Sequence, residues 1–226
     1  IEGLKQQVRD SLPLLKDKLL NELIEGSFRR GKEETIQRME YLNVCIHSVY
    51  YQVVSIEFDY DESFCWDVDD RQLWKFAVSN IIREILADQF AFEICYDRDD
   101  KICIIMGMDN IDYQNGIDPL LENRLELIRA SVSKHLGFTI TIGVGNEKNE
   151  LFDIPQSYKE SLVAVKSKLT IGKNRIITYS SIADSVIKRN LFTAEHRSQL
   201  LMNMRTVDEA EVHTLISQIF LEMRYE

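Results

Sequence analysis

Residues 138–179, with the sequence FTITIGVGNEKNELFDIPQSYKESLVAVKSKLTIGKNRIITY, decide which fold this chain adopts. Their first part, Phe138–Ile142, alternates apolar and polar residues and is rich in β-branched side chains. This pattern predicts a half-buried strand. Asp153 then offers an N-cap, and Pro155 stands in the first turn of a predicted helix, where a missing N–H costs nothing. The stretch therefore opens as a strand followed by a helix.

The predicted helix has one apolar face and leads into a second strand. Gly172 is placed to cap the helix, and Ile176–Tyr179 is predicted as a short strand. The apolar residues at helical spacing are Tyr158, Leu162, Val165 and Leu169. A strand–helix–strand unit of this kind must pack the apolar face of its helix onto a sheet.

Two glycines in this stretch suggest a dinucleotide-binding motif, but the rest of the motif is missing. Gly143 and Gly145 begin a GxGxxG pattern, and Lys148 stands where the third glycine belongs. The helix also starts well after the glycines, so its N-terminus is not aimed at a phosphate. We therefore interpret Gly143 and Gly145 as glycines that end a strand.

Three segments of this region carry a family resemblance: TIGVG at Thr141–Gly145, SYKES at Ser157–Ser161 and GKNRIITY at Gly172–Tyr179. Together they resemble the middle region of bacterial response regulators that have a receiver domain before it and an AraC-type DNA-binding domain after it. The resemblance extends from the N-terminal Leu-rich helix to about Ile182. It implies a nucleotide-cyclase-like (GGDEF-like) sheet without its catalytic motif, in a cytoplasmic two-component regulator that contacts DNA only through another domain.

The composition excludes several classes of function. The 226 residues are 45% hydrophobic, enough for one large or two small domains with a sizeable core. A net charge of −10 argues against nucleic-acid binding by this segment, because affinity for phosphates comes from clustered Lys and Arg. No apolar run approaches the ~18 residues of a membrane span. Reduced thiols, without a metal or cofactor, are expected because no CxxC spacing links Cys45, Cys65, Cys95 and Cys103.

The remaining elements predict an α/β (α+β) fold. Residues 49–58 are apolar almost throughout, which indicates a central strand covered on both faces. An amphipathic helix is predicted over residues 68–87, a hairpin over 90–106, and a helix over 119–136 that ends at Gly137. The order β-α-β-β-α-β-α-β is a split βαβ arrangement, typical of a ferredoxin-like or nucleotide-cyclase-like mixed sheet packed with helices. The inward positions predicted on the first of these helices are Leu73, Phe76, Ala77, Ile81, Ile85 and Leu86.

The pattern divides the chain into three parts. Residues 1–45 are predicted as a helical linker or dimerisation segment, residues 46–182 as the GGDEF-like domain, and residues 183–226 as helices leading towards a DNA-binding domain. The N-terminal helix carries a short heptad-like stripe, which fits either a homodimer seam or a helix packed on its own domain. Leu14 and Leu20 widen the later part of this stripe and favour burial there. The candidate seam residues are Ile1, Leu4, Val8, Leu12 and Leu15.

The strongest candidates for chemistry follow the central strand. Asp59 and Asp61 are two apart on an extended chain, so their carboxylates would point to the same face and suit a hard cation. Active GGDEF-type cyclases resemble this arrangement, but the hairpin here has YDRDDK at residues 96–101 in place of the glycine-containing motif. Trp66 and Asp99 complete the candidate ligand-binding set, with a solvated acidic loop as the alternative.

These observations favour a non-enzymatic role. The first hypothesis is a regulatory domain that couples a receiver to a DNA-binding domain, through a homodimer with two arrangements. The second is a sensor of a sugar, nucleotide or other small molecule that binds near Asp59, Asp61, Trp66 and Asp99. An active nucleotide cyclase is disfavoured because no catalytic residue set is visible in the hairpin.

Overall fold

The computed structural model describes the chain in several ranges. These are residues 2–28, 31–44, 46, 48–59, 68–99, 101–109 and 117–182, with the side chains of residues 2–10, 68 and 69 left out. The chain divides into two compact units, residues 1–182 and residues 183–226. The second unit, with its predicted helices, lies outside the described residues.

A five-stranded mixed sheet forms the centre of the first unit, in the order β2-β3-β1-β4-β5. β4 and β5 are parallel, and the other neighbouring strands are antiparallel. The strands are β1 (Tyr50–Asp59), β2 (Ala91–Tyr96), β3 (Ile102–Met108), β4 (Thr139–Val144) and β5 (Ile176–Thr178). The predicted strand order along the chain, the central strand and the hairpin are confirmed.

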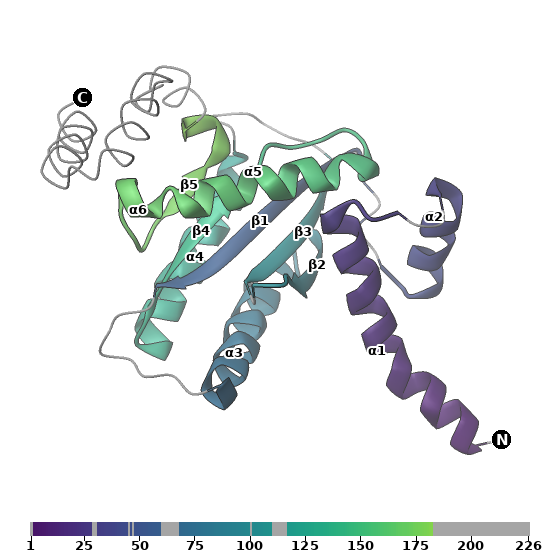
Figure 1. Cartoon of the computed structure of the whole chain (residues 1–226). Helices are drawn as coiled ribbons and strands as arrows, with labels where there is room; N and C mark the ends of the chain where they lie inside the picture. Colours follow the sequence, from purple (N-terminus) through teal and green to yellow (C-terminus); the bar gives the residue numbers. More distant parts are fainter. Residues whose placement is uncertain are drawn as a thin grey trace, which may run out of the picture. The chain divides into compact units, whose positions relative to one another are not determined.

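Helices cover both faces of this sheet (Figure 1). α3 and α4 pack on one face, where their apolar side chains join a core with those of Val54, Ile56 and Phe58. α1 and α2 share the opposite core with Tyr51 and Val53, and α5 lies against β1 and β4. The helices are α1 (Glu2–Glu25), α2 (Lys32–Tyr41), α3 (Val68–Leu86), α4 (Pro119–Leu136), a 3-10 turn (Leu151–Asp153), α5 (Ile154–Lys166) and α6 (Lys168–Ile171).

The predicted boundaries of α4 are confirmed by its two caps. The Asp118 carboxylate accepts the backbone N–H of Leu120 at 2.8 Å, and Pro119 stands in the first turn. Gly137 ends the helix with φ of 79°, a left-handed conformation that suits glycine. The N-cap predicted for α5 is only partly right, because Asp153 holds that position without a side-chain hydrogen bond to the helix.

Three positions predicted to be buried on the helices after β1 are exposed. Leu73 and Phe76 of α3 are 59% and 63% exposed, because the buried stripe of that helix runs through Val78, Ile82 and Leu86. Leu169 is 86% exposed, because the predicted single helix is interrupted at Ser167 and continues as the separate turn α6. Helical periodicity gives the spacing of an apolar stripe, but a break shifts its phase.

The N-terminal helix α1 combines buried and exposed leucines. Leu19, Leu20 and Leu23 are buried in the core against β1–β3, whereas Leu15 is 43% exposed. Leu14 is 72% exposed, so its predicted burial is wrong. The end of α1 nearest the N-terminus points away from the sheet (Figure 1). The private-core interpretation therefore holds for the last turns of α1, and the dimer-seam interpretation stays a prediction for the earlier ones.

Two glycines allow α5 to lie directly on β4. A Cβ on Gly143 would stand 2.3 Å from the carbonyl oxygen of Ser161, and one on Gly145 would stand 2.0 Å from that of Ser157. Gly143 lies within β4 and Gly145 just after it, so these glycines do more than end a strand. At this contact the hydroxyl of Ser157 accepts the backbone N–H of Val53 at 2.9 Å. The position of α5 thus depends on the absence of side chains from β4.

Replacing Gly143 with alanine should strongly destabilise the domain. The new methyl group would meet backbone atoms of α5, which cannot yield as a side chain can. We expect a loss of about 3 kcal/mol in the free energy of unfolding, measured by urea denaturation. Gly137→Ala is the control, because its Cβ would meet nothing within 4 Å and the only cost is that of the left-handed conformation, about 1 kcal/mol. Equal losses in the two variants would contradict the close-approach explanation.

Candidate functional site

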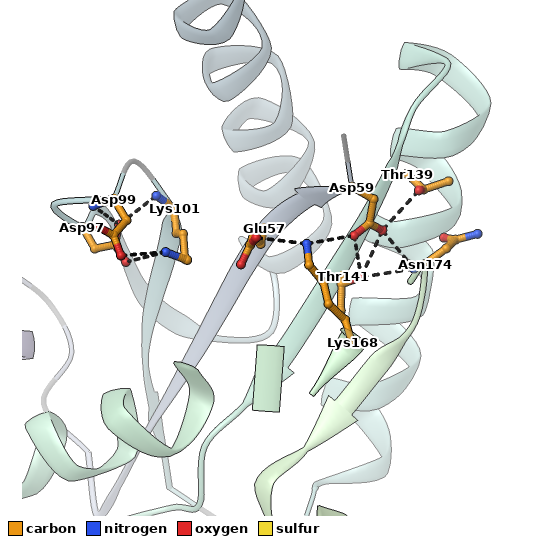
Figure 2. Close-up of polar contacts among 9 residues, drawn as sticks. All are labelled: Glu57, Asp59, Asp97, Asp99, Lys101, Thr139, Thr141, Lys168 and Asn174. Carbon is orange, nitrogen blue, oxygen red and sulfur yellow. Dashed lines mark hydrogen bonds and ion pairs between the residues drawn. The ribbon is translucent and has the colours of Figure 1, made fainter. Parts of the chain in front are cut away.

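The carboxylate of Asp59, the last residue of β1, is buried and held by the protein itself. It accepts the hydroxyl of Thr141 at 2.8 Å and that of Thr139 at 3.1 Å, both from β4 (Figure 2). The backbone N–H of Asn174, in the loop before β5, donates to it at 2.9 Å. The ammonium group of Lys168 adds a charged contact at 3.2 Å. Both carboxylate oxygens are therefore engaged.

Lys168 links two carboxylates on the same face of β1. Its ammonium group lies 3.0 Å from Glu57 and 3.2 Å from Asp59, and its side chain is only 10% exposed. The two acidic residues are two apart on the strand, as the extended-chain argument requires. The sequence argument expected this arrangement for Asp59 and Asp61 with a metal ion. The structure shows Glu57 and Asp59 with a lysine.

The turn between β2 and β3 is organised by Asp97. The Asp97 carboxylate accepts the backbone N–H groups of Asp99 at 2.9 Å and Lys101 at 2.8 Å, a local pattern that stabilises turns. Lys101 also contacts Asp99 at 3.0 Å, and this hydrogen bond lowers the pKa of Asp99. Burial alone would lower the pKa of Lys101, but the hydrogen bond to Asp99 and the charge of Asp97 outweigh it and raise that pKa.

The same turn is joined to two helices. The hydroxyl of Tyr158, on α5, donates to Asp97 at 3.0 Å. Burial, together with the nearby charges, raises the pKa of Tyr158 well above its usual range, so the hydroxyl keeps the proton that it donates. Arg98 donates to both oxygens of Glu25, at the end of α1, at 2.5 and 2.6 Å. A fork-to-carboxylate pair of this kind is directional as well as charged.

An open groove of about 470 Å³ lies beside this turn, between α1 and α5. It is lined by Ile24, Glu25, Ser27, Asp97, Arg98, Asp99, Tyr158 and Lys159.

The structure brings together only part of the predicted site. Asp59 is placed at the end of β1 as expected, and Asp99 is exposed in the hairpin turn. In Figure 2 the residues around Asp59 and those of the turn form two groups on either side of Glu57. Asp61 and Trp66 lie outside the described residues, so their part in a site stays a prediction.

Sequence reasoning missed the residues that hold the site together. Nothing in the sequence marks Lys168 as a site residue, because the apolar periodicity predicts one continuous helix and gives no indication of the break at Ser167. Glu57 lies within the predicted strand at residues 49–58, and nothing in the strand pattern marks it as a partner of a lysine. Asp97 did carry a signal, because an aspartate that opens a polar turn favours hydrogen bonds to the backbone two residues on.

A family model for the GGDEF-like domain matches residues 26–167, which is more than half of the chain. The chain belongs to the GGDEF-like domain family. This supports the GGDEF-like part of the sequence interpretation, whereas the match itself concerns neither a receiver nor an AraC-type domain.

Two solved structures are similar to this GGDEF-like chain. The active GGEEF domain of a diguanylate cyclase from Vibrio cholerae is 17% identical, with a TM-score of 0.45, over 69% of this chain and 94% of that one. The GGDEF domain of DgcB from Caulobacter crescentus in complex with c-di-GMP is 15% identical, with a TM-score of 0.44, over 72% and 87%. No curated protein gives a significant match.

The described part of this GGDEF-like domain contains neither a cluster of metal ligands nor a helix suited to span a membrane. Within it, no group of three or more His, Cys, Asp or Glu side chains is arranged to hold a metal ion. Cys95 and Cys103 are buried free thiols that face each other on β2 and β3, while Cys45 and Cys65 lie outside the described residues. None of the helices described is long and apolar enough to cross a membrane.

Removing the Lys168 charge should destabilise the domain more than removing an exposed one. Lys168→Met leaves the buried Asp59 carboxylate without its ammonium partner, which we expect to cost about 3 kcal/mol of unfolding free energy. Lys166→Met, an exposed position two residues earlier, should change stability by less than about 0.5 kcal/mol. Urea denaturation measures both.

Combining Lys168→Met with Asp59→Asn tests the cause of that loss. The double variant removes both charges and should be more stable than Lys168→Met alone, because no unpaired charge remains buried. If Lys168→Met behaves like Lys166→Met, the buried pair does not have the role given to it.

Proposed function

We propose that this GGDEF-like domain is a non-enzymatic relay in an AraC-type two-component response regulator. The observation that carries the proposal is the buried Asp59 carboxylate, whose oxygens are already engaged by Lys168, Thr139, Thr141 and the backbone of Asn174. The family match supports the GGDEF-like domain type. The resemblance of residues 141–145, 157–161 and 172–179 to AraC-type response regulators supports the regulatory context. The protein would act in the cytoplasm and contact DNA through a separate domain.

The chemistry of nucleotidyl transfer supports a non-enzymatic role. Metal-assisted transfer needs carboxylates that are free to coordinate a cation and a backbone that admits a triphosphate. Here Glu57 and Asp59 share a lysine ammonium group. The hairpin turn that would approach a nucleotide consists of charged residues. Its backbone N–H groups at Asp99 and Lys101 already donate to the Asp97 carboxylate. Contacts within the domain therefore occupy both the carboxylates that a cation would need and the backbone that a triphosphate would approach.

The signal would enter through α1. The helix is anchored in the core by Leu19, Leu20 and Leu23, while Leu14 and Leu15 remain exposed closer to its N-terminus. Leu15, an exposed leucine of the predicted heptad-like seam, fits a second copy of the same helix, since a parallel pair would bury it. A receiver could thereby change the spacing or rotation of two α1 helices, and the sheet would pass the change to residues that follow β5.

A charge in the proposed seam should weaken the dimer. Leu15→Glu places a carboxylate where two α1 helices would meet, and we expect the dimer dissociation constant to rise at least about tenfold. Sedimentation equilibrium of the 226-residue chain measures it. Leu127→Glu is the control, because Leu127 of α4 is similarly exposed, 49% against 43%, and lies on the other side of the sheet. A wild-type chain that stays monomeric at high concentration would remove the support for the relay.

A small-molecule sensor is the second candidate, favoured by the groove of about 470 Å³ beside Asp99 and Tyr158. The charged and hydroxyl side chains among its lining residues suit a ligand that makes several hydrogen bonds, such as a sugar or a nucleotide. In this version the ligand, rather than a receiver, would bias α1.

A thermal-shift screen separates the sensor from the relay. A ligand present at 100 times its Kd that binds only the folded chain stabilises it by roughly 2.7 kcal/mol. The sensor predicts a saturable shift from the sugars, nucleotides and divalent cations tested that Asp99→Ala removes and Asp88→Ala, an exposed aspartate after α3, retains. The relay predicts no such shift. Incubation with GTP and Mg²⁺ should release no pyrophosphate, and release would contradict both non-enzymatic candidates.

A further inference from the structure

The end of α1 is fastened to the β2–β3 turn by one side chain of the turn. Arg98 reaches both carboxylate oxygens of Glu25, the last residue of α1, at 2.5 and 2.6 Å. Glu25 is about a quarter exposed and Arg98 is 82% exposed. The pair is thus accessible to water, and its strength depends on the fork geometry and on salt.

The turn that carries Arg98 is hydrogen-bonded to the side chain of Asp97 and, through that side chain, to α5. Asp97, whose side chain is 3% exposed, accepts two backbone N–H groups of the turn and the hydroxyl of Tyr158. Arg98 is the next residue in the chain, so its position is fixed relative to Tyr158. A displacement of Glu25 is therefore coupled to α5 through Arg98, Asp97 and the hydroxyl of Tyr158.

These polar contacts lie next to the apolar cluster that joins α1 and α5 through Leu23, Ile24, Ile154 and Tyr158. The groove of about 470 Å³ separates α1, the turn and α5 there, and its walls include Glu25, Arg98 and Tyr158. Immediately after Glu25, Gly26 ends α1 with φ of 71°, and its Cα faces the ring of Pro155 at the start of α5. Opening of the Arg98–Glu25 pair therefore frees the groove side of the last turn of α1, while Leu23 and Ile24 hold its other side in the core.

We propose that the β2–β3 turn is a clasp, in which Arg98 holds the end of α1 and Asp97 holds α5, so that release of α1 loosens α5. In this scheme residues 96–101, which stand where cyclases have their glycine-containing motif, couple the movements of two helices. The clasp would transmit movement from α1 to α5 within the proposed relay. Its biological role therefore rests on the proposed function. Its test, however, needs neither a dimer nor a receiver, so the two can fail separately.

Hydrogen–deuterium exchange of the 226-residue chain tests the clasp. Arg98→Glu places two carboxylates together and should accelerate exchange several-fold in the last turns of α1 and in the first turns of α5. Glu25→Arg should do the same. The double variant restores an opposite-charge pair and should return both regions towards the wild-type rates.

Tyr158→Phe tests whether the signal passes through Asp97. In that background Arg98→Glu should still accelerate exchange in α1, but the additional acceleration in α5 should disappear. Arg124→Glu is the matched control, because Arg124 is an arginine of α4 that bonds Gln89 at 2.8 Å on the other face of the sheet. It should leave α1 and α5 unchanged.

Two results would overturn the clasp. One is unchanged exchange of α1 in Arg98→Glu, which would show that the ion pair does not hold the helix. The other is an acceleration of α5 by Arg98→Glu that persists unchanged in the Tyr158→Phe background, which would show that the contact of Asp97 with Tyr158 transmits nothing. Slow exchange of β1 and β3 in every variant establishes that the sheet stays folded, so a general loss of structure cannot imitate either outcome.

Discussion

The central strand β1 is buried on both faces, and this constraint determines how its polar end is built. Val54, Ile56 and Phe58 enter one core while Tyr51 and Val53 enter the other. A strand in this position has no solvent next to it, so a carboxylate at its end must find donors within the protein. Two hydroxyl groups of β4, one backbone N–H and one lysine satisfy this requirement for Asp59. Asp59, a candidate ligand-binding residue on sequence grounds, is thereby part of the structural framework.

The position of α5, which covers β1 and β4, depends on two residues without side chains, Gly143 and Gly145. Gly143 and Gly145 bring α5 so close to β4 that backbone atoms of the two elements meet. Close approach then allows short side chains to complete the hydrogen bonding of β1, as Ser157 does for Val53. The same helix places Tyr158 over the β2–β3 turn. The geometry of the turn and the packing of the glycines are therefore connected through one rigid element.

The sequence predicted the order of strands and helices well, because long apolar patterns, caps and polar turns act locally. Pro119 and Gly137 bound α4 for reasons contained in a few neighbouring residues. It failed where a distant contact chooses between alternatives. Nothing local shows that Leu73 faces solvent, or that Lys168 leaves the helix to reach a strand more than 100 residues away in the chain. The site is a product of tertiary packing, so pattern reasoning reached Asp59 but not its partners.

The two kinds of contact in this domain differ in how easily they exchange with water. The apolar clusters on the sheet lose hydrophobic free energy whenever they open, and they keep the sheet in one arrangement. An exposed ion pair such as Arg98 with Glu25 is nearly as well satisfied by water, so opening it changes the free energy little. Two arrangements of similar free energy arise most readily where elements are joined by exposed polar contacts. The pair of Arg98 with Glu25 is such a contact between the hairpin turn and α1, whereas Leu23 and Ile24 of the same helix are fixed in the apolar core shared with Ile154 of α5.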